Sequence, residues 1–172
     1  KLLEKDEIQQ LILDVREEKI HGLNVTVPFK KTIIPFLDTL SEEAKNSQSV
    51  NTVYKIKDKV IGDNTDIYGF KKGLETANQI IKNKDALILG AGGVVSSIII
   101  ALKEMQISKI YLSNRTKLKA LELKKLFPEI EIIEWGQVSS FDIMINATSI
   151  GLNNKDEINI DYKNISKKKF FY

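Results

Sequence analysis

Two different hydrophobic patterns divide the chain near residue 83. After that point, short apolar runs alternate with segments whose apolar residues recur at helical spacing. The strands expected there are residues 86–89, 109–113, 130–133 and 141–146, and the helices are residues 98–105 and 118–127. Strands that alternate with helices of this length are typical of a parallel, doubly wound sheet. The pattern therefore predicts an α/β protein with a Rossmann-like domain over residues 84–172.

The part before residue 83 has shorter elements of both kinds, and we interpret residues 1–83 as part of a second, α/β domain. Apolar residues at helical spacing predict a surface helix, and alternating residues predict strands. The helix is expected over residues 2–19, and the strands over residues 21–28, 49–56 and 60–66. Ser41 precedes two acidic residues and is a plausible N-cap of a short helix.

Lys30 is unusual for its expected position. Pro28 ends the strand before it and is suited to begin a helix, since proline lacks the N–H that a first helical residue leaves unpaired. Lys30 would then lie in the first helical turn, where a cation is unfavourable. Such a local violation often marks a functional site. A solvated surface lysine is an equally good interpretation of this stretch alone.

Asp66 stands at the head of the next helical pattern, which runs to Ile81. The plain interpretation of Asp66 is an N-cap, a role that aspartate fills well. The alternative is a carboxylate at the edge of a cleft. The two interpretations are compatible.

A glycine-rich turn follows the apolar run at residues 86–89. Gly90 allows a tight turn, and Gly92 lets the backbone approach a phosphate because it has no side chain. The first N–H groups of the helix that follows would face that anion. The third glycine of the dinucleotide-binding fingerprint is replaced by Val95. By itself the turn is also compatible with any α/β domain, so it predicts a dinucleotide site only together with its surroundings.

The end of the second strand of this domain predicts which cofactor binds. An acidic residue there would accept hydrogen bonds from the ribose 2′-hydroxyl of NAD. This chain has Asn114-Arg115-Thr116 instead. An arginine pairs with the 2′-phosphate of NADP, which a carboxylate would repel. The sequence therefore favours NADP, although binding alone would not establish catalysis.

Composition excludes several functions. The chain of 172 residues has 26 basic and 23 acidic residues and a formal net charge of +3, so no strong field favours nucleic acid or an anionic membrane. The absence of cysteine excludes disulfides, thiolate metal sites and cysteine nucleophiles, and it fits the cytoplasm. One histidine is too few for a histidine metal site. We expect a small-molecule substrate and a monomer or homodimer.

Six short blocks occur in an order and at spacings that resemble the shikimate dehydrogenase family. They are Asn24–Lys30, Val50–Thr52, Gly62–Asp66, Gly90–Gly93, Asn114–Thr116 and Asn146–Leu152. The resemblance runs from about residue 20 to the end of the chain. It implies a two-domain oxidoreductase that reversibly reduces 3-dehydroshikimate to shikimate with NADPH. This is a step of aromatic amino-acid biosynthesis, and its site would lie between the domains.

The resemblance also assigns roles to residues. It makes Lys30 the catalytic lysine and Asp66 its partner, with Thr26, Asn51 and Asp66 on the substrate. The residues implied to hold the pyrophosphate are Gly90, Ala91, Gly92, Gly93 and Val94. Those implied to hold the adenosine 2′-phosphate are Asn114, Arg115 and Thr116. Ala147, Thr148 and Ser149, in a loop that runs to Leu152, are implied to lie on the nicotinamide side.

Parts of the family pattern have no counterpart here. The family has an N-terminal pair of serines for the substrate carboxylate and a C-terminal segment with a substrate-binding glutamine. We therefore expect a fragment that lacks both termini and has little or no activity alone. The alternatives are a quinate/shikimate dehydrogenase that uses NAD, a glutamyl-tRNA reductase-like protein, a non-catalytic NADP-binding relative and a module of a fused enzyme. The blocks that contain Lys30 and Asp66 argue against a glutamyl-tRNA reductase-like protein.

Overall fold

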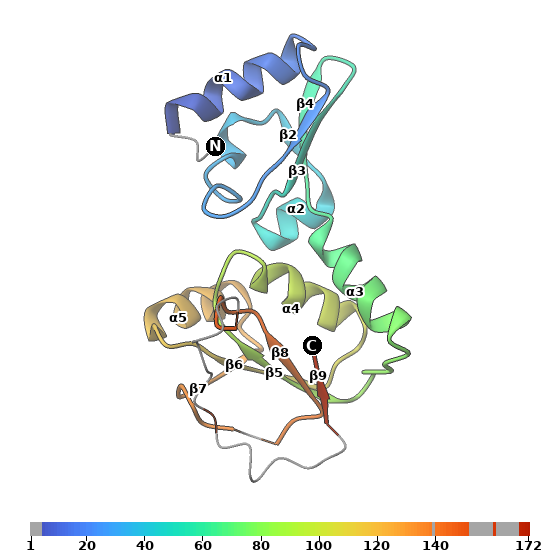
Figure 1. The fold of residues 1–172 in the computed structure, drawn as a ribbon, viewed down its shortest axis with the longest axis vertical. Coiled ribbons are helices and arrows are strands. Elements are labelled where there is room, and N and C mark those ends of the chain that lie inside the picture. The colour runs from blue at the N-terminus through green and yellow to red at the C-terminus, as the bar shows by residue number, and fades with distance from the viewer. Residues whose placement is uncertain (1–4, 139, 152–159, 161–168) are drawn as a thin grey trace.

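A computed structural model describes residues 5–138, 140–151, 160 and 169–172 as two units, each built on one β-sheet. The two units lie one above the other in Figure 1, and helix α3 (Asp66–Thr76) leads from the first to the second. The chain passes between the two sheets at residues 63–66, where β4 ends and α3 begins.

The first unit is a four-stranded sheet with the strand order β1-β3-β4-β2. Its elements are α1 (Lys5–Arg16), β1 (Gly22–Asn24), the 3₁₀ helix η1 (Ile34–Phe36), β2 (Thr39–Leu40), α2 (Glu42–Ser47), β3 (Thr52–Ile56) and β4 (Lys59–Asp63). Strands β1, β3 and β4 are antiparallel neighbours, and β2 pairs with β4 in parallel. Helix α1 buries Ile8, Ile12 and Val15 against the sheet, since these positions share one helix face. The expected strands of this part are confirmed with bounds that differ by a few residues, and the expected helix is confirmed over residues 5–16, since residues 2–4 lie outside the described ones.

Helix α2 confirms the expected cap. Ser41 is the residue directly before α2. Its hydroxyl oxygen accepts a hydrogen bond from the Ala44 backbone N–H at 3.1 Å. Glu42 and Glu43 occupy its first turn, where negative charge is favourable.

The second unit is a parallel sheet with the strand order β7-β6-β5-β8-β9. Its elements are β5 (Asp85–Leu89), α4 (Val95–Glu104), β6 (Lys109–Ser113), α5 (Lys117–Leu126), β7 (Glu131–Ile133), β8 (Ile143–Asn146) and β9 (Phe170–Phe171). This architecture confirms the predicted α/β class with a doubly wound sheet. Strand order reverses beside β5, and ligands of such sheets bind at the carboxyl ends of the strands at this point.

Strand β5 lies at the centre of the sheet and is buried on both faces. Ala86 and Ile88 face a core that also contains side chains of α3, α4 and α5, whereas Leu87 and Leu89 face the opposite side. Helix α3 thus precedes residue 83 in the chain but packs in the second core through Ile67, Phe70 and Leu74. A division of the chain at residue 83 stays a proposal.

An ion pair in the first unit leads to a prediction about pH and stability. The Arg16 guanidinium donates two hydrogen bonds to the Asp38 carboxylate, at 2.8 and 2.9 Å, and the Val60 N–H donates a third at 2.7 Å. These contacts, Arg16 first, hold the pKa of Asp38 below its ordinary value of 3.8. Because the folded-state pKa is depressed, the stabilisation is present above the unfolded-state pKa and is lost as the pH falls through the folded-state value.

We therefore expect Asp38→Asn to lower the free energy of unfolding at pH 7, and we expect the difference from the parent protein to shrink as the pH falls below 3.8. Urea unfolding followed between pH 7 and pH 3 measures the difference. Asp58→Asn, at an exposed turn position, is the matched control and is expected to change little at either pH. A stability loss in Asp38→Asn that is independent of pH would contradict the prediction.

None of the helices in the described ranges is long and apolar enough to cross a membrane.

Candidate functional site

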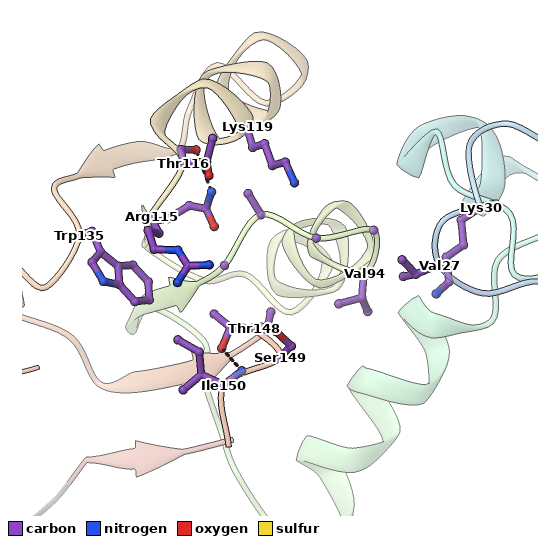
Figure 2. A pocket seen from close by; sticks show the side chains of 16 residues that line it. Val27, Lys30, Val94, Arg115, Thr116, Lys119, Trp135, Thr148, Ser149 and Ile150 are labelled. Atoms are coloured by element: carbon purple, nitrogen blue, oxygen red, sulfur yellow. Dashed lines mark hydrogen bonds between the residues drawn. The ribbon is translucent and has the colours of Figure 1, made fainter. Parts of the chain in front are cut away.

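A cavity of about 460 Å³ lies at the carboxyl ends of the strands of the second sheet. Residues 90–94, 114–116 and 147–150 contribute to it, and these segments follow β5, β6 and β8 respectively. Val27 and Lys30 of the first unit line the end of the cavity that lies opposite Arg115, as Figure 2 shows. The cavity thus lies between the two units and contains all the residues predicted to bind the cofactor.

The glycine turn after β5 is shaped by one close backbone contact. Gly90 has φ +110°, which side chains rarely allow, and a Cβ there would lie 2.7 Å from the Ala147 carbonyl oxygen. A Cβ on Gly92 or Gly93 would meet nothing nearer than 3.8 Å. Helix α4 begins directly after the turn without a side-chain cap and with no acidic residue in its first turn. The turn therefore leaves an open surface in front of a helix N-terminus, an arrangement that suits a phosphate.

The segment after β6 provides positive charge at the far end of the cavity. The Asn114 side-chain amide donates to the Thr116 carbonyl at 2.8 Å and holds the turn. Arg115 and Lys119 are exposed, and no carboxylate in the described ranges forms an ion pair with either. Figure 2 shows Trp135 beside Arg115 at this end. Two cations without a carboxylate partner at a cavity wall are suited to bind an anionic group.

The loop after β8 is braced by its own hydrogen bonds. The Asn146 side-chain oxygen accepts hydrogen bonds from the Thr148 hydroxyl at 2.7 Å and from its N–H at 3.1 Å. The Thr148 hydroxyl oxygen accepts from the Ile150 N–H at 3.0 Å. The Ala147 N–H donates to the Leu89 carbonyl and joins the loop to β5. Residues 147–150 therefore form a fixed wall of the cavity, while Leu152 lies outside the described residues.

Lys30 and Asp66 form an ion pair between the two units. The Lys30 ammonium Nζ lies 2.6 Å from Asp66 Oδ2, and their side chains are only 12% and 23% exposed. The Asn51 side-chain amide donates to the other carboxylate oxygen of Asp66 at 2.9 Å. Asp66 lines a second cavity, of about 330 Å³, and Val94 and Ala147 contribute to both cavities. The ion pair therefore lies where the two cavities meet.

The predicted helix that begins at Pro28 is wrong. Residues 27–33 form consecutive turns, and the first helical segment after them is η1. The Lys30 carbonyl accepts a hydrogen bond from the Val50 N–H at 2.8 Å, a partner distant in the chain. Because this long-range bond ties the turn to the segment before β3, Lys30 is held in a loop and does not lie in a first helical turn.

The predicted N-cap role of Asp66 is also wrong. Asp66 is the first residue of α3, and Thr65 precedes it at the cap position without a side-chain capping bond. The side-chain oxygen of Asn64 instead accepts hydrogen bonds from the Asp66 N–H at 3.0 Å and the Ile67 N–H at 3.4 Å. The Asp66 carboxylate is thus left for Lys30 and Asn51.

Two of the predicted substrate residues lie outside both cavities. Asn51 reaches Asp66, as described above, whereas Thr26 is exposed and its carbonyl accepts from the Phe29 N–H. Sequence reasoning missed other residues that line the larger cavity: Val27, Lys119, Trp135 and Ile150. Val27 and Ile150 lie inside the blocks Asn24–Lys30 and Asn146–Leu152, whereas Lys119 and Trp135 belong to no motif and reach the cavity only through chain folding. Within the described ranges, no group of histidine and acidic side chains is arranged to hold a metal ion.

Comparison with known proteins gives consistent similarities over both units. Residues 1–53 match the family described as shikimate dehydrogenase substrate binding domain, and residues 74–164 match shikimate / quinate 5-dehydrogenase. A shikimate dehydrogenase (NADP(+)) of Pelagibacter ubique is 72% identical over 171 residues, which are 99% of this chain and 64% of the relative.

Solved structures agree with this similarity. The crystal structure of shikimate dehydrogenase from Aquifex aeolicus has a TM-score of 0.86 at 36% identity, and the match covers 98% of this chain and 64% of that one. The Thermus thermophilus enzyme, in complex with NADP(H) and shikimate, has a TM-score of 0.73 at 30% identity. That match covers 86% of this chain and 54% of the other. The chain therefore spans less than two thirds of the length of these relatives.

Proposed function

The chain belongs to the shikimate dehydrogenase family, and from this premise we propose that the protein reversibly reduces 3-dehydroshikimate to shikimate with NADPH. The proposal makes it an oxidoreductase of a CH–OH group that serves aromatic amino-acid biosynthesis. The single observation that best supports it is the Lys30–Asp66 ion pair, half-enclosed between the cofactor cavity and a second pocket.

The chemistry of ketone reduction explains why a lysine suits this position. Negative charge develops on the carbonyl oxygen as the carbon accepts a hydride. A protonated lysine beside that oxygen stabilises the charge and donates the proton that completes the hydroxyl. In the reverse direction the neutral amine accepts this proton. We propose this role for Lys30.

Asp66 and Asn51 would hold that lysine and the substrate in place. A carboxylate that accepts a hydrogen bond from an ammonium fixes its position. Asp66 does this with one oxygen, and Asn51 fixes the other. A substrate with several hydroxyls needs neutral and charged acceptors together. Thr26, Asn51 and Asp66 stay our proposed substrate contacts.

The larger cavity fits a dinucleotide with a 2′-phosphate. The open surface at Gly92 and Gly93 suits the pyrophosphate, and Arg115, with Asn114 and Thr116, suits the phosphate on the ribose. When bound, NADPH supplies the hydride. Ala147 lines both cavities, and Thr148 and Ser149 follow it along the larger one, so we propose that the three residues lie along the nicotinamide end.

An assay on the complete protein encoded by the reading frame tests the proposal. Oxidation of shikimate with NADP⁺, followed by NADPH absorbance, is expected to give turnover, whereas quinate or NAD⁺ is expected to give much less. Equal or faster turnover with quinate or NAD⁺ would favour the alternative quinate/shikimate enzyme. Binding of NADPH without turnover of either substrate would favour a non-catalytic relative.

Arg115 should determine the choice between the two nicotinamide cofactors. Charge-assisted hydrogen bonds contribute about 1.5–3 kcal/mol, so Arg115→Ala is expected to weaken NADPH binding about 10- to 100-fold. NADH binding should change little, because NADH lacks the phosphate. Calorimetric titration of both cofactors measures this difference. Lys117→Ala is the control, since Lys117 pairs with Glu134 and does not line the cavity. An equal loss of affinity for both cofactors would contradict the assignment.

Two further aspects of the protein stay predictions from its sequence. We propose a cytoplasmic enzyme that works as a monomer or a homodimer. Neither an interaction with nucleic acid nor one with a membrane is part of the proposal.

A further inference from the structure

Asn64 is a buried polar residue at the passage between the two units. Its side chain is 2% exposed and lies among three serines, Ser47, Ser49 and Ser97, that are 0% exposed. Buried polar side chains need hydrogen-bond partners, because unsatisfied groups are costly. Asn64 has partners on both of its amide atoms, and these partners belong to different parts of the fold.

The oxygen and the nitrogen of the Asn64 side-chain amide bind different backbone segments. Its oxygen accepts the N–H groups of Asp66 and Ile67 at the start of α3. Its nitrogen donates to the Ser49 carbonyl at 2.8 Å. If the amide were flipped, its NH₂ group would face the N–H groups of α3 and its oxygen would face the Ser49 carbonyl, and neither pair can form a hydrogen bond. These backbone partners therefore fix the orientation of the amide. Asn64 thereby determines where the backbone of Asp66 lies.

The same amide is attached to the cofactor side of the site. Its nitrogen lies 3.0 Å and its oxygen 3.2 Å from the hydroxyl of Ser97, in the first turn of α4. The Ser49 hydroxyl donates to the carbonyl of Gly93, in the glycine turn, at 3.3 Å. Asn64 thus connects α4 and, through Ser49, the glycine turn to the start of the helix that presents Asp66.

We propose that Asn64 is a positioning residue, held by Ser97, that keeps the Asp66 carboxylate aligned with the cofactor cavity. The inference rests on the proposed function insofar as Asp66 acts in the reaction. Asn64 touches neither cavity and acts only through Asp66 and Lys30. A small displacement of such a pair strongly lowers turnover while cofactor binding persists.

Ser97→Ala tests this link with little risk to folding, because it removes only a hydroxyl. In the complete protein, we expect kcat to fall about tenfold while the calorimetric Kd for NADPH stays within about twofold of the parent value. Ser96→Ala is the matched control. Ser96 is the neighbouring residue of α4, is 1% exposed, and forms no side-chain hydrogen bond within the described residues. An equal loss of kcat in both variants would overturn the proposal.

A second comparison separates positioning from a general structural effect. In an Asp66→Ala background, Ser97→Ala should cause no further loss of the residual turnover, because the group it positions is gone. Asn64→Ala should behave in the same way if it folds. A full tenfold loss in the Asp66→Ala background would show that Ser97 acts by another route and would overturn the proposal.

Amide hydrogen exchange gives a readout that needs no substrate. Ser97→Ala should speed exchange of the Asp66 and Ile67 amides, whereas the Leu74 amide on the same helix should be unaffected and Ser96→Ala should change none of them. Unchanged exchange at Asp66 would overturn the inference. If the parent protein oxidises no shikimate, the proposed function fails, but the exchange result still tests whether Asn64 and Ser97 position Asp66.

Discussion

Replacement of Lys30 by alanine is expected to lower kcat for shikimate oxidation by about 10²- to 10⁴-fold, the usual contribution of a positioned general acid or base. The variant loses the ammonium that lies 2.6 Å from Asp66 and borders the cofactor cavity. We expect its Kd for NADPH to stay close to the parent value, because Arg115, which is proposed to bind the 2′-phosphate, lies at the far end of the cavity. Steady-state kinetics and calorimetric titration on the complete protein measure both quantities.

The neighbouring lysine provides the control for Lys30→Ala. Lys31 is exposed, lines neither cavity and forms no ion pair within the described residues, so Lys31→Ala should retain full turnover. Lys30→Arg keeps the charge but changes the shape of the donor group, and we expect it to recover only a small part of the activity. Turnover within a few-fold of the parent in Lys30→Ala would eliminate the proposed role.

The two glycines of the cofactor turn should fail in different ways when each is replaced by alanine. Gly90→Ala puts a side chain at φ +110° and a methyl 2.7 Å from the Ala147 carbonyl oxygen, which belongs to the backbone and cannot rotate away. The backbone conformation alone costs about 1–3 kcal/mol. We therefore expect a clear fall in the free energy of unfolding as well as lost cofactor binding.

Gly92→Ala meets no such obstacle, because its nearest neighbour would be 3.8 Å away and its φ is not positive. This variant should fold as stably as the parent and still bind NADPH poorly, since the methyl would occupy the surface that faces the pyrophosphate. Urea unfolding and calorimetric titration of both variants measure the contrast. Normal NADPH affinity in Gly92→Ala would show that the phosphates bind elsewhere.

The second sheet could be predicted almost completely from the sequence. Each of its first four strands is an apolar run that ends at a turn, and the helices between them show clear helical spacing. The residues predicted to bind the cofactor follow the strand ends, and parallel strands bring those ends together at one edge. Local pattern and global topology therefore agree for residues 90–94, 114–116 and 147–149, all of which line one cavity.

The first unit was less predictable from the sequence, because long-range backbone hydrogen bonds determine the conformation of its loops. Pro28 indicated a helix by local rules, but the bond between the Lys30 carbonyl and Val50 holds residues 27–33 in turns. Asp66 similarly matched the composition of an N-cap, yet Asn64 provides that function. Propensity describes what a segment does alone, and tertiary contacts override it where they compete.

Residues that meet only in the folded chain gave no sequence signal. Trp135 lines the cavity near Arg115 and belongs to no motif, and Val27, at the opposite end, lies in the block Asn24–Lys30 without an assigned role. The contact of Asn64 with Ser97 joins side chains 33 residues apart. Such pairs follow from the packing of α3 against α4, which no periodicity in either segment encodes.

The passage of the chain at residues 63–66 has a consequence for motion between the two units. Lys30 belongs to the first unit, whereas Asp66 begins a helix that is packed in the core of the second. We expect any rotation of one unit against the other to change the distance between Lys30 Nζ and Asp66 Oδ2, since each unit provides one member of the pair. The geometry of the proposed catalytic pair would therefore report on the angle between the two units.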